Sequence, residues 1–139
     1  MKNITVLIDT NIFIDVLQDR IPFTDNSQAV IGLVTQKKIK GAVAAHSITN
    51  LWYILRKTHS DEERRNYLLS LFEFFDVISI DKNRLVAALE KSDFKDFEDC
   101  LQDECAYAIN ADYIITRNAK DFESSMVKAL TPEEFLENL

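Results

Sequence analysis

The sequence predicts an α/β fold: a three-layer sandwich with a central, mostly parallel sheet of four to five strands. The first observation is that short apolar runs rich in β-branched residues alternate with longer amphipathic segments, which is typical of strands joined by helices. The second is the length, because 139 residues suit one domain, here residues 1–139. The third is the composition, since 47% hydrophobic and 28% charged residues exclude global disorder.

The elements of the N-terminal half follow from local signals. Ile4–Ile8 is a short β-branched run, which predicts a buried strand. Asp9-Thr10-Asn11 is typical of a helix start, and apolar residues follow it at helical spacing. Pro22 predicts the start of a second helix and Gly41 its end. We then expect a small strand at Ala42–Ala45.

The same alternation continues to the C-terminus. Ser60 and Glu63 have the spacing of a capping box, which predicts a helix to about residue 75. Thr131 precedes a proline in the first helical position. We expect helices after Ser47, Ser60, Asp81, Asp96 and Thr131, strands at Val77–Ile80, Tyr113–Thr116 and Val127–Leu130, and a short turn or helix after Asn118.

Missing motifs narrow the function. Two glycines cannot form a Walker loop or a GxGxxG motif, and two histidines cannot form HExxH or a three-histidine zinc site. Cys100 and Cys105 match no metal or disulfide spacing, which indicates buried free thiols. The apolar stretches are too short to cross a membrane, and the N-terminus does not fit a signal peptide. We therefore expect a cytoplasmic protein with no membrane partner.

The charge limits any role with nucleic acid. The net charge is −7, with 23 acidic and 16 basic residues, and most of the acidic excess follows residue 60. Such a surface repels nucleic acid over about 8 Å at physiological salt, so binding needs a basic strip or bound cations. Residues 37–65 supply a candidate strip for RNA, although its members also fit solvated helix ends. These residues are Lys37, Lys38, Lys40, Arg56, Lys57, Arg64 and Arg65.

Polar residues follow the predicted strands. Ligands of parallel sheets bind outside the carboxyl ends of the strands, where Asp9 and Asn118 would both lie. A carboxylate closing a buried strand loses solvation, which costs about several kcal/mol unless it is paired or binds a cation. Asp9 is therefore a candidate metal ligand. The alternative is that it only caps the following helix.

Other acids extend this candidate site. Asp99 and Asp103 are spaced i, i+4, so a shared cation would relieve their repulsion on one helix face. The alternative is a solvated acidic face or the first turn of a helix. Glu98 points to another side of the helix and is a weaker candidate. Asp121 follows the fourth predicted strand and so reaches the same edge as Asp9.

Converging carboxylates have a specific chemical use. Their hard oxygen atoms bind Mg²⁺ or Mn²⁺, and such ions activate water and stabilise the leaving oxygen in phosphodiester cleavage. The ions also offset negative charge where an anionic substrate enters. A net charge of −7 is thus compatible with a nuclease.

Three motifs resemble those of the PIN-domain family in order and spacing, over nearly the whole chain. They are Leu7-Ile8-Asp9-Thr10-Asn11, Asp96-Phe97-Glu98-Asp99 and the stretch from Ile115 to Phe122, ITRNAKDF. The resemblance implies a sandwich around a parallel sheet and a metal-dependent endoribonuclease that hydrolyses RNA. Stand-alone members of this size are often VapC-like toxins, which implies a cognate antitoxin. Aromatic residues left exposed on the middle helices would form the antitoxin face or that of a homodimer.

The resemblance also implies the site residues. It makes Asp9, Asp99 and Asp121 the catalytic metal ligands. The resemblance and the spacing arguments together predict supporting residues around these ligands. They are Thr10, Asn11, Asn50, Glu98, Asp103, Thr116 and Asn118.

Two positions depart from the family pattern. Asn50 stands nearest the place of a usual Glu, and Asn118 stands where many members have Asp. The alternative function is therefore a catalytically weakened PIN fold that acts as an RNA- or protein-binding module. Other acid-based folds fit less well. A dehalogenase-type phosphatase needs a second Asp at position 11, which is Asn, and a receiver domain needs a late Lys where Arg117 stands.

Overall fold

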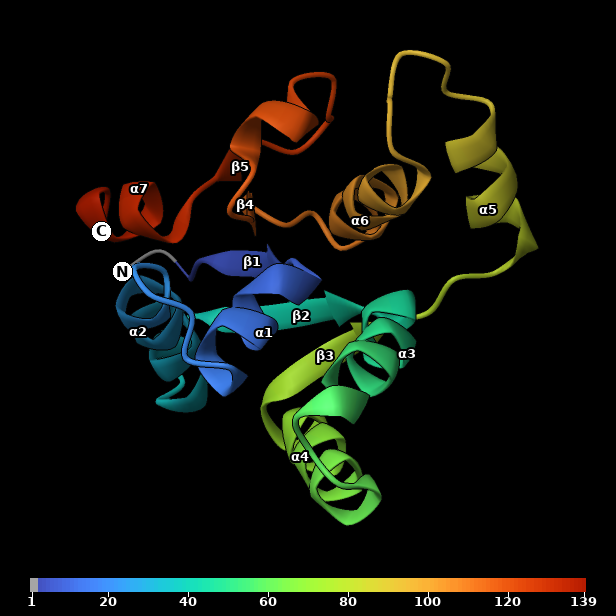
Figure 1. The fold of residues 1–139 in the computed structure, drawn as a ribbon. Coiled ribbons are helices and arrows are strands. Elements are labelled where there is room, and N and C mark those ends of the chain that lie inside the picture. Colours follow the sequence, from blue (N-terminus) through green and yellow to red (C-terminus); the bar gives the residue numbers. More distant parts are fainter. Residues whose placement is uncertain (1–2) are drawn as a thin grey trace.

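A computed structural model describes residues 3–139 and shows a five-stranded, wholly parallel sheet with helices on both faces (Figure 1). The strands are β1 (Thr5–Ile8), β2 (Lys40–Ala44), β3 (Phe75–Ile78), β4 (Tyr113–Ile115) and β5 (Ala129–Leu130), in the order β3-β2-β1-β4-β5. This confirms the predicted fold class. Met1 and Lys2, which belong to the predicted domain 1–139, lie outside the described residues.

The helices divide between the two faces. One apolar core joins the sheet to α1, α2, α3, α4 and α7, and the other joins it to α5 and α6 (Figure 1). No helix within residues 3–139 is long and apolar enough to cross a membrane. The helices are α1 (Thr10–Leu17), α2 (Thr24–Thr35), α3 (Ala45–Ile54), α4 (Asp61–Phe74), α5 (Lys82–Leu89), α6 (Phe97–Ala108) and α7 (Pro132–Glu137), with 3₁₀ turns η1 (Leu55–Lys57) and η2 (Ala119–Phe122).

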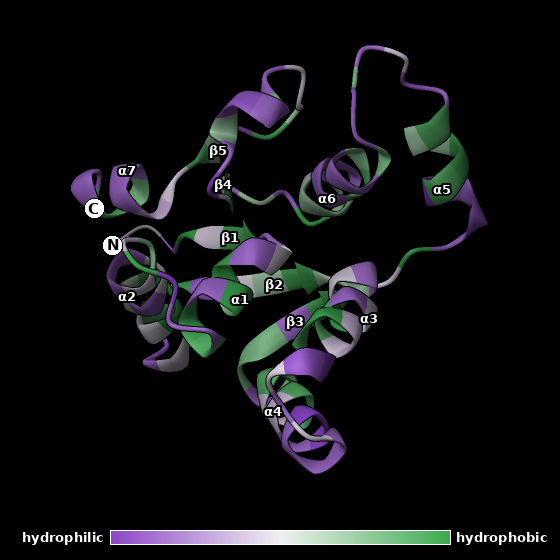
Figure 2. Cartoon of the chain, viewed as in Figure 1, coloured by the Kyte–Doolittle hydropathy of each residue, from purple (hydrophilic) through white to green (hydrophobic). Residues whose placement is uncertain are grey.

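The central strand is buried on both faces. Side chains alternate along a strand, so Val6 and Ile8 enter one core and Leu7 the other. All three are fully buried, which explains why β1 is a continuous apolar run rather than an alternating one. Figure 2 shows hydrophobic residues along the strands and hydrophilic ones on the outer side of α4.

Most predicted helix starts are confirmed by their capping bonds. The side chains of Ser60 and Thr131 each form a complete capping box, and those of Asp81 and Asp96 accept a hydrogen bond from a first-turn amide. Both cysteines are free and buried, as predicted.

Three local predictions are wrong. The second helix begins at Thr24 rather than at Pro22. Gly41 does not end the second helix but lies within β2. The position requires a glycine because a Cβ there would stand 2.7 Å from Val34 Cγ1 and 2.8 Å from the Phe75 ring. Ser47 is inside α3 and fully buried, while the helix begins after Ala44 without a side-chain cap.

Candidate active site

Asp9 lies at the carboxyl edge of the sheet, between the ends of β1 and β4. Its backbone N–H donates to the Ile115 carbonyl at 2.9 Å, which extends the pairing of the two strands by one residue. Its carboxylate Oδ1 accepts from the Thr10 N–H at 2.8 Å, so Asp9 does cap α1. The side chain is nevertheless only 7% exposed, and the cap accounts for one of its several contacts.

Buried polar side chains hold the Asp9 carboxylate in place. Thr116 Oγ1 donates to Asp9 Oδ2 at 2.9 Å, and Gln102 Nε2 donates to Asp9 Oδ1 at 3.2 Å. The same Gln102 amide donates to Ser47 Oγ at 2.9 Å, which in turn accepts from Thr10 Oγ1 at 2.8 Å. The network joins α1, α3, α6 and the end of β4, so four separate segments fix one carboxylate.

Gln102 and Ser47 are functional candidates that sequence reasoning missed. Gln102 is three residues after Asp99 on α6, a spacing that puts both side chains on one helix face, and this signal could have identified it. For Ser47, the sequence pattern predicts only a helix cap. Gln102 Oε1 is buried and has no hydrogen-bond partner within residues 3–139, so an acceptor remains available at the base of the site.

A pocket of about 260 Å³ opens above this network. It gathers residues from the end of β1, from α3, from the start of α6 and from the segment that follows β4. All the predicted ligands and supporting residues except Asp103 line it. The lining residues are Asp9, Thr10, Asn11, His46, Asn50, Ile54, Asp96, Glu98, Asp99, Gln102, Thr116, Asn118, Asp121 and Phe122.

The expectation that Asp103 faces the site is wrong. Its carboxylate is fully buried and accepts from the backbone N–H groups of Met126 at 2.9 Å and Val127 at 3.0 Å. The reason is the direction of α6, which starts at the carboxyl edge of the sheet and runs away from it. A residue one turn after Asp99 therefore lies about 5.4 Å farther from that edge. Asp103 instead holds the segment that leads into β5.

The pocket carries unbalanced negative charge. Partial burial, together with the charges of Asp9, Asp96 and Asp121, raises the pKa of Asp99 to about 7. Burial also raises the pKa of Asp9, although the hydrogen bonds from Thr116 and Thr10 oppose the shift. No lysine or arginine is among the described residues that line this pocket. A cation that entered would relieve the repulsion between the carboxylates.

The donor atoms suit a hard cation. Carboxylate and amide oxygens predominate, and these are the ligands that Mg²⁺ and Mn²⁺ prefer. Within residues 3–139, no three carboxyl, imidazole or thiol groups are gathered closely enough to form a ready-made metal cage. The arrangement therefore fits an ion held by one or two carboxylates that keeps several of its waters, which is usual for Mg²⁺.

The predicted basic strip is not continuous. Lys37 and Lys38 precede β2 and so lie at the amino edge of the sheet, opposite the pocket, which makes their predicted place beside the site wrong. Arg56 and Lys57 follow α3, whose residue Ile54 lines the pocket. The Arg56 guanidinium lies 3.7 Å from the centroid of the exposed Tyr53 ring.

The raised pKa of Asp99 has a consequence for stability. An ordinary aspartate pKa is 3.8, so between about pH 4 and 7 Asp99 binds more protons in the folded protein than in the unfolded chain. The contribution of Asp99 to the free energy of unfolding therefore falls as pH rises through this range. We expect the free energy of unfolding of Asp99→Asn to decrease less with pH. Its melting temperature should therefore be higher than that of the parent at pH 8 but not at pH 4. Thermal melts in chelator test this, with Glu73→Gln on exposed α4 as the control. Parallel curves for parent and Asp99→Asn would contradict it.

Comparison with known proteins gives the class to which this fold and pocket belong. The family profile of the PIN domain matches residues 5–120. The chain therefore belongs to the PIN domain family, as the motifs predicted.

Individual relatives resemble the chain over nearly its full length. It is 26% identical to the ribonuclease VapC1 of Aquifex aeolicus (strain VF5), over 99% of this chain and 96% of that protein. Its fold is similar to that of VapBC-1 from nontypeable Haemophilus influenzae, with a TM-score of 0.69, 16% identity and coverage of 94% of this chain and 99% of that one. VapBC2 from Rickettsia felis, bound to a promoter DNA fragment, gives a TM-score of 0.68, 19% identity and coverage of 92% and 98%.

Proposed function

We propose that this protein is an endoribonuclease that depends on Mg²⁺ or Mn²⁺ and acts in the cytoplasm as the toxin of a toxin–antitoxin pair. The observation that carries the proposal is the single pocket lined by Asp9, Asp99 and Asp121, whose mutual repulsion favours a cation. RNA as substrate is supported by the relative named ribonuclease VapC1. An antitoxin partner is supported by structural neighbours that are toxin–antitoxin complexes.

The residues present fit a divalent ion. Asp9 and Asp99 would hold it, with the exposed Asp121 at the rim and Gln102 Oε1 available to accept from an ordered water. When bound, the ion supplies an activated water and stabilises charge on the phosphate. The protein's own contribution is positional, because Thr116 and Gln102 fix the Asp9 carboxylate before any ligand arrives.

A second candidate is a binding module without catalysis, which the amides at Asn50 and Asn118 favour. One contact argues against it. Asn50 Nδ2 donates to Glu98 Oε2 at 3.3 Å, so a carboxylate from α6 stands next to the position where the family usually has Glu. The negative charge expected there is thus supplied by another residue.

A cleavage assay tests the proposal. Purified protein is incubated with labelled RNA in Mg²⁺, in Mn²⁺ and in chelator, and the products are separated by length. We expect internal cleavage that chelator abolishes and added ion restores. RNA that is bound but never cut would favour the binding module, and RNA that is neither bound nor cut would contradict both functions.

The partner surface is proposed on α3 and α4. Phe75 packs in the core and Trp52 is half-buried, but the side chains of Tyr53, Phe72 and Phe74 are exposed. Large apolar side chains that remain exposed mark association surfaces. We infer that this face takes the antitoxin or a second copy of the chain.

We expect neutralisation of Arg56 and Lys57 to weaken RNA binding. The double variant Arg56→Gln, Lys57→Gln removes two cations beside the pocket. The slope of the logarithm of the binding constant against the logarithm of the salt concentration should therefore become shallower by up to about 1.4 for single-stranded RNA. The matched control is Lys37→Gln, Lys38→Gln at the opposite edge, which should leave the slope unchanged. Binding isotherms at several salt concentrations measure both. Equal slopes for the two double variants would remove Arg56 and Lys57 from the RNA surface.

A further inference from the structure

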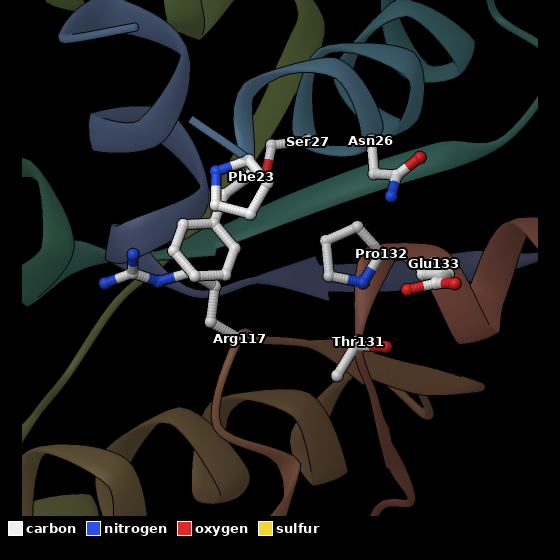
Figure 3. Close-up of a pocket in the computed structure, with 8 residues that line it drawn as sticks. Phe23, Asn26, Ser27, Arg117, Thr131, Pro132 and Glu133 are labelled. Atoms are coloured by element: carbon white, nitrogen blue, oxygen red, sulfur yellow. The ribbon is translucent and has the colours of Figure 1, made fainter. Parts of the chain in front are cut away.

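A second pocket, of about 270 Å³, lies between the start of α2 and the start of α7. Figure 3 shows the Phe23 ring and Pro132 on opposite sides of it, with Arg117 beside the ring. We propose that this pocket binds one nucleobase of the RNA strand whose phosphate enters the acidic pocket. The inference rests on the proposed function and names a further part of its substrate site.

The Phe23 side forms a ready stacking surface. Phe23 is 42% exposed, and the Arg117 guanidinium lies 4.6 Å from the centroid of its ring. Arg117 is held there by an ion pair of 3.1 Å with Asp15, whose side chain is fully buried. Aromatic rings and arginine planes are the side chains on which unpaired RNA bases stack. The buried carboxylate fixes the cation, so the surface is ordered before RNA binds.

The two pockets are joined along the surface. A third pocket shares lining residues with both, and two of its residues, Arg117 and Thr131, also line the Phe23 pocket. The same third pocket is lined by Asn118 and Asp121, which also line the acidic pocket. Lys120 also lines this connecting pocket, beside the acidic Asp121 and Glu134, and is the free cation that a crossing sugar–phosphate backbone would meet among these lining residues. A base in the Phe23 pocket therefore belongs to a nucleotide close to the cleaved phosphate.

The size and rim of the pocket fit a single base. Pockets for drug-sized ligands span about 300–1,000 Å³, so this one suits a smaller planar group. Asn26 and Glu133 stand at its rim, and neither side chain has a hydrogen bond within residues 3–139. A carboxylate only accepts hydrogen bonds, so Glu133 favours bases with an exocyclic amino group. Uracil offers only its ring N3–H, and the carbonyl oxygens on both sides of that group repel a carboxylate.

Nucleotide titrations followed by amide NMR test the assignment directly. In chelator, AMP, CMP and GMP should shift the backbone amides of Phe23, Asn26 and Glu133, and UMP should shift them least. Shifts confined to the amides of other residues, or no shifts at all, would overturn the proposal that this pocket binds a nucleobase. Equal shifts with all four nucleotides would overturn the assignment of Glu133 to the base edge.

Binding of a short RNA oligonucleotide supplies the second measurement. Phe23→Ala should weaken affinity about tenfold, whereas Tyr107→Ala should not change it. Tyr107 is also exposed, but it lies on α6, which packs on the opposite face of the sheet from α2. Phe23→Leu keeps an apolar side chain against Arg117 but lacks a π face, so it replaces Phe23→Ala should that variant not fold. Unchanged affinity in the folded variant would overturn the proposal.

The two proposals fail in different ways. A chain that cuts no RNA in any ion, but whose oligonucleotide affinity falls in Phe23→Ala, contradicts the nuclease and keeps the base pocket. Asp9-dependent cleavage that Phe23→Ala leaves unchanged keeps the nuclease and overturns the base pocket. Weaker binding of a partner polypeptide in Phe23→Ala, with RNA affinity intact, makes this a protein-docking pocket and likewise overturns the proposal.

Discussion

Replacement of Asp9 by asparagine is expected to abolish metal-dependent RNA cleavage, with a loss of at least about a hundredfold. Asp9 is the carboxylate that the fold fixes most firmly, through Thr10, Thr116 and Gln102. It is also 7% exposed at the base of the pocket, where an ion would meet it in a site with little bulk water. Removing its charge removes a ligand without changing the shape of the pocket.

The same substitution should leave the fold intact. The asparagine oxygen still accepts from the Thr10 N–H, so α1 keeps its cap, and asparagine is as good a cap as aspartate. Burial raises the pKa of Asp9, which means that its charge destabilises the folded state at neutral pH. We therefore expect a melting temperature at or above that of the parent in chelator.

Single-turnover cleavage in Mg²⁺ and in Mn²⁺, together with thermal melts, measures both effects. The matched control is Asp76→Asn, the same chemical change at an exposed position on β3. It should cleave at the rate of the parent. Parental cleavage by Asp9→Asn would show that Asp9 is no ligand, and unfolding of the variant would show that its charge has a structural role.

Local signals in the sequence were sufficient for most of the fold. The apolar run before Asp9 predicted the central strand, and the capping pattern at Ser60 predicted α4, because both depend on neighbouring residues alone. Gly41 shows where this fails. Its small size is required by the Phe75 ring, 34 positions later in the chain, and no local pattern records that contact.

The site residues that directly follow a strand could be predicted from the sequence. Asp9 and Thr116 follow β1 and β4, so their shared edge follows from parallel topology. Helix residues were harder, because spacing gives a face but not the direction in which the helix runs. Spacing alone therefore groups Asp99 with Asp103, whereas Asp103 binds the segment before β5 and the α6 residues that line the pocket are Glu98, Asp99 and Gln102.

Lys37 and Lys38 illustrate the same limit for charge. They are close in sequence to Arg56, but β2 separates them by the length of the sheet. The prediction grouped these residues by sequence, although the fold places the two lysines at the amino edge of the sheet and Arg56 beside the pocket at its carboxyl edge. A strip of charge can be predicted only after the strand directions are known.

Glu98→Gln is expected to lower Mn²⁺ affinity by about tenfold, although Glu98 was the weakest acid by helix spacing. Its carboxylate is brought to the rim by the 3.3 Å hydrogen bond from Asn50, next to the position where the family usually has Glu. A negative charge near the ion strengthens binding through electrostatic attraction, and glutamine removes that charge while keeping the hydrogen-bonding shape.

The double variant Asn50→Glu, Glu98→Gln distinguishes charge from position. It moves the carboxylate from α6 to α3 and should restore most of the lost affinity, whereas Asn50→Glu alone should change affinity little because Glu98 already supplies the charge. Asp103→Asn is the control, since Asp103 binds the Met126 and Val127 amides away from the pocket, and we expect it to lower stability but not Mn²⁺ affinity. Calorimetric titration of the four variants measures the Mn²⁺ affinities, and a thermal melt of Asp103→Asn measures its stability. A strong gain in Asn50→Glu with no loss in Glu98→Gln would mean that residue 50 is a vacant ligand position and that Glu98 takes no part in binding the ion.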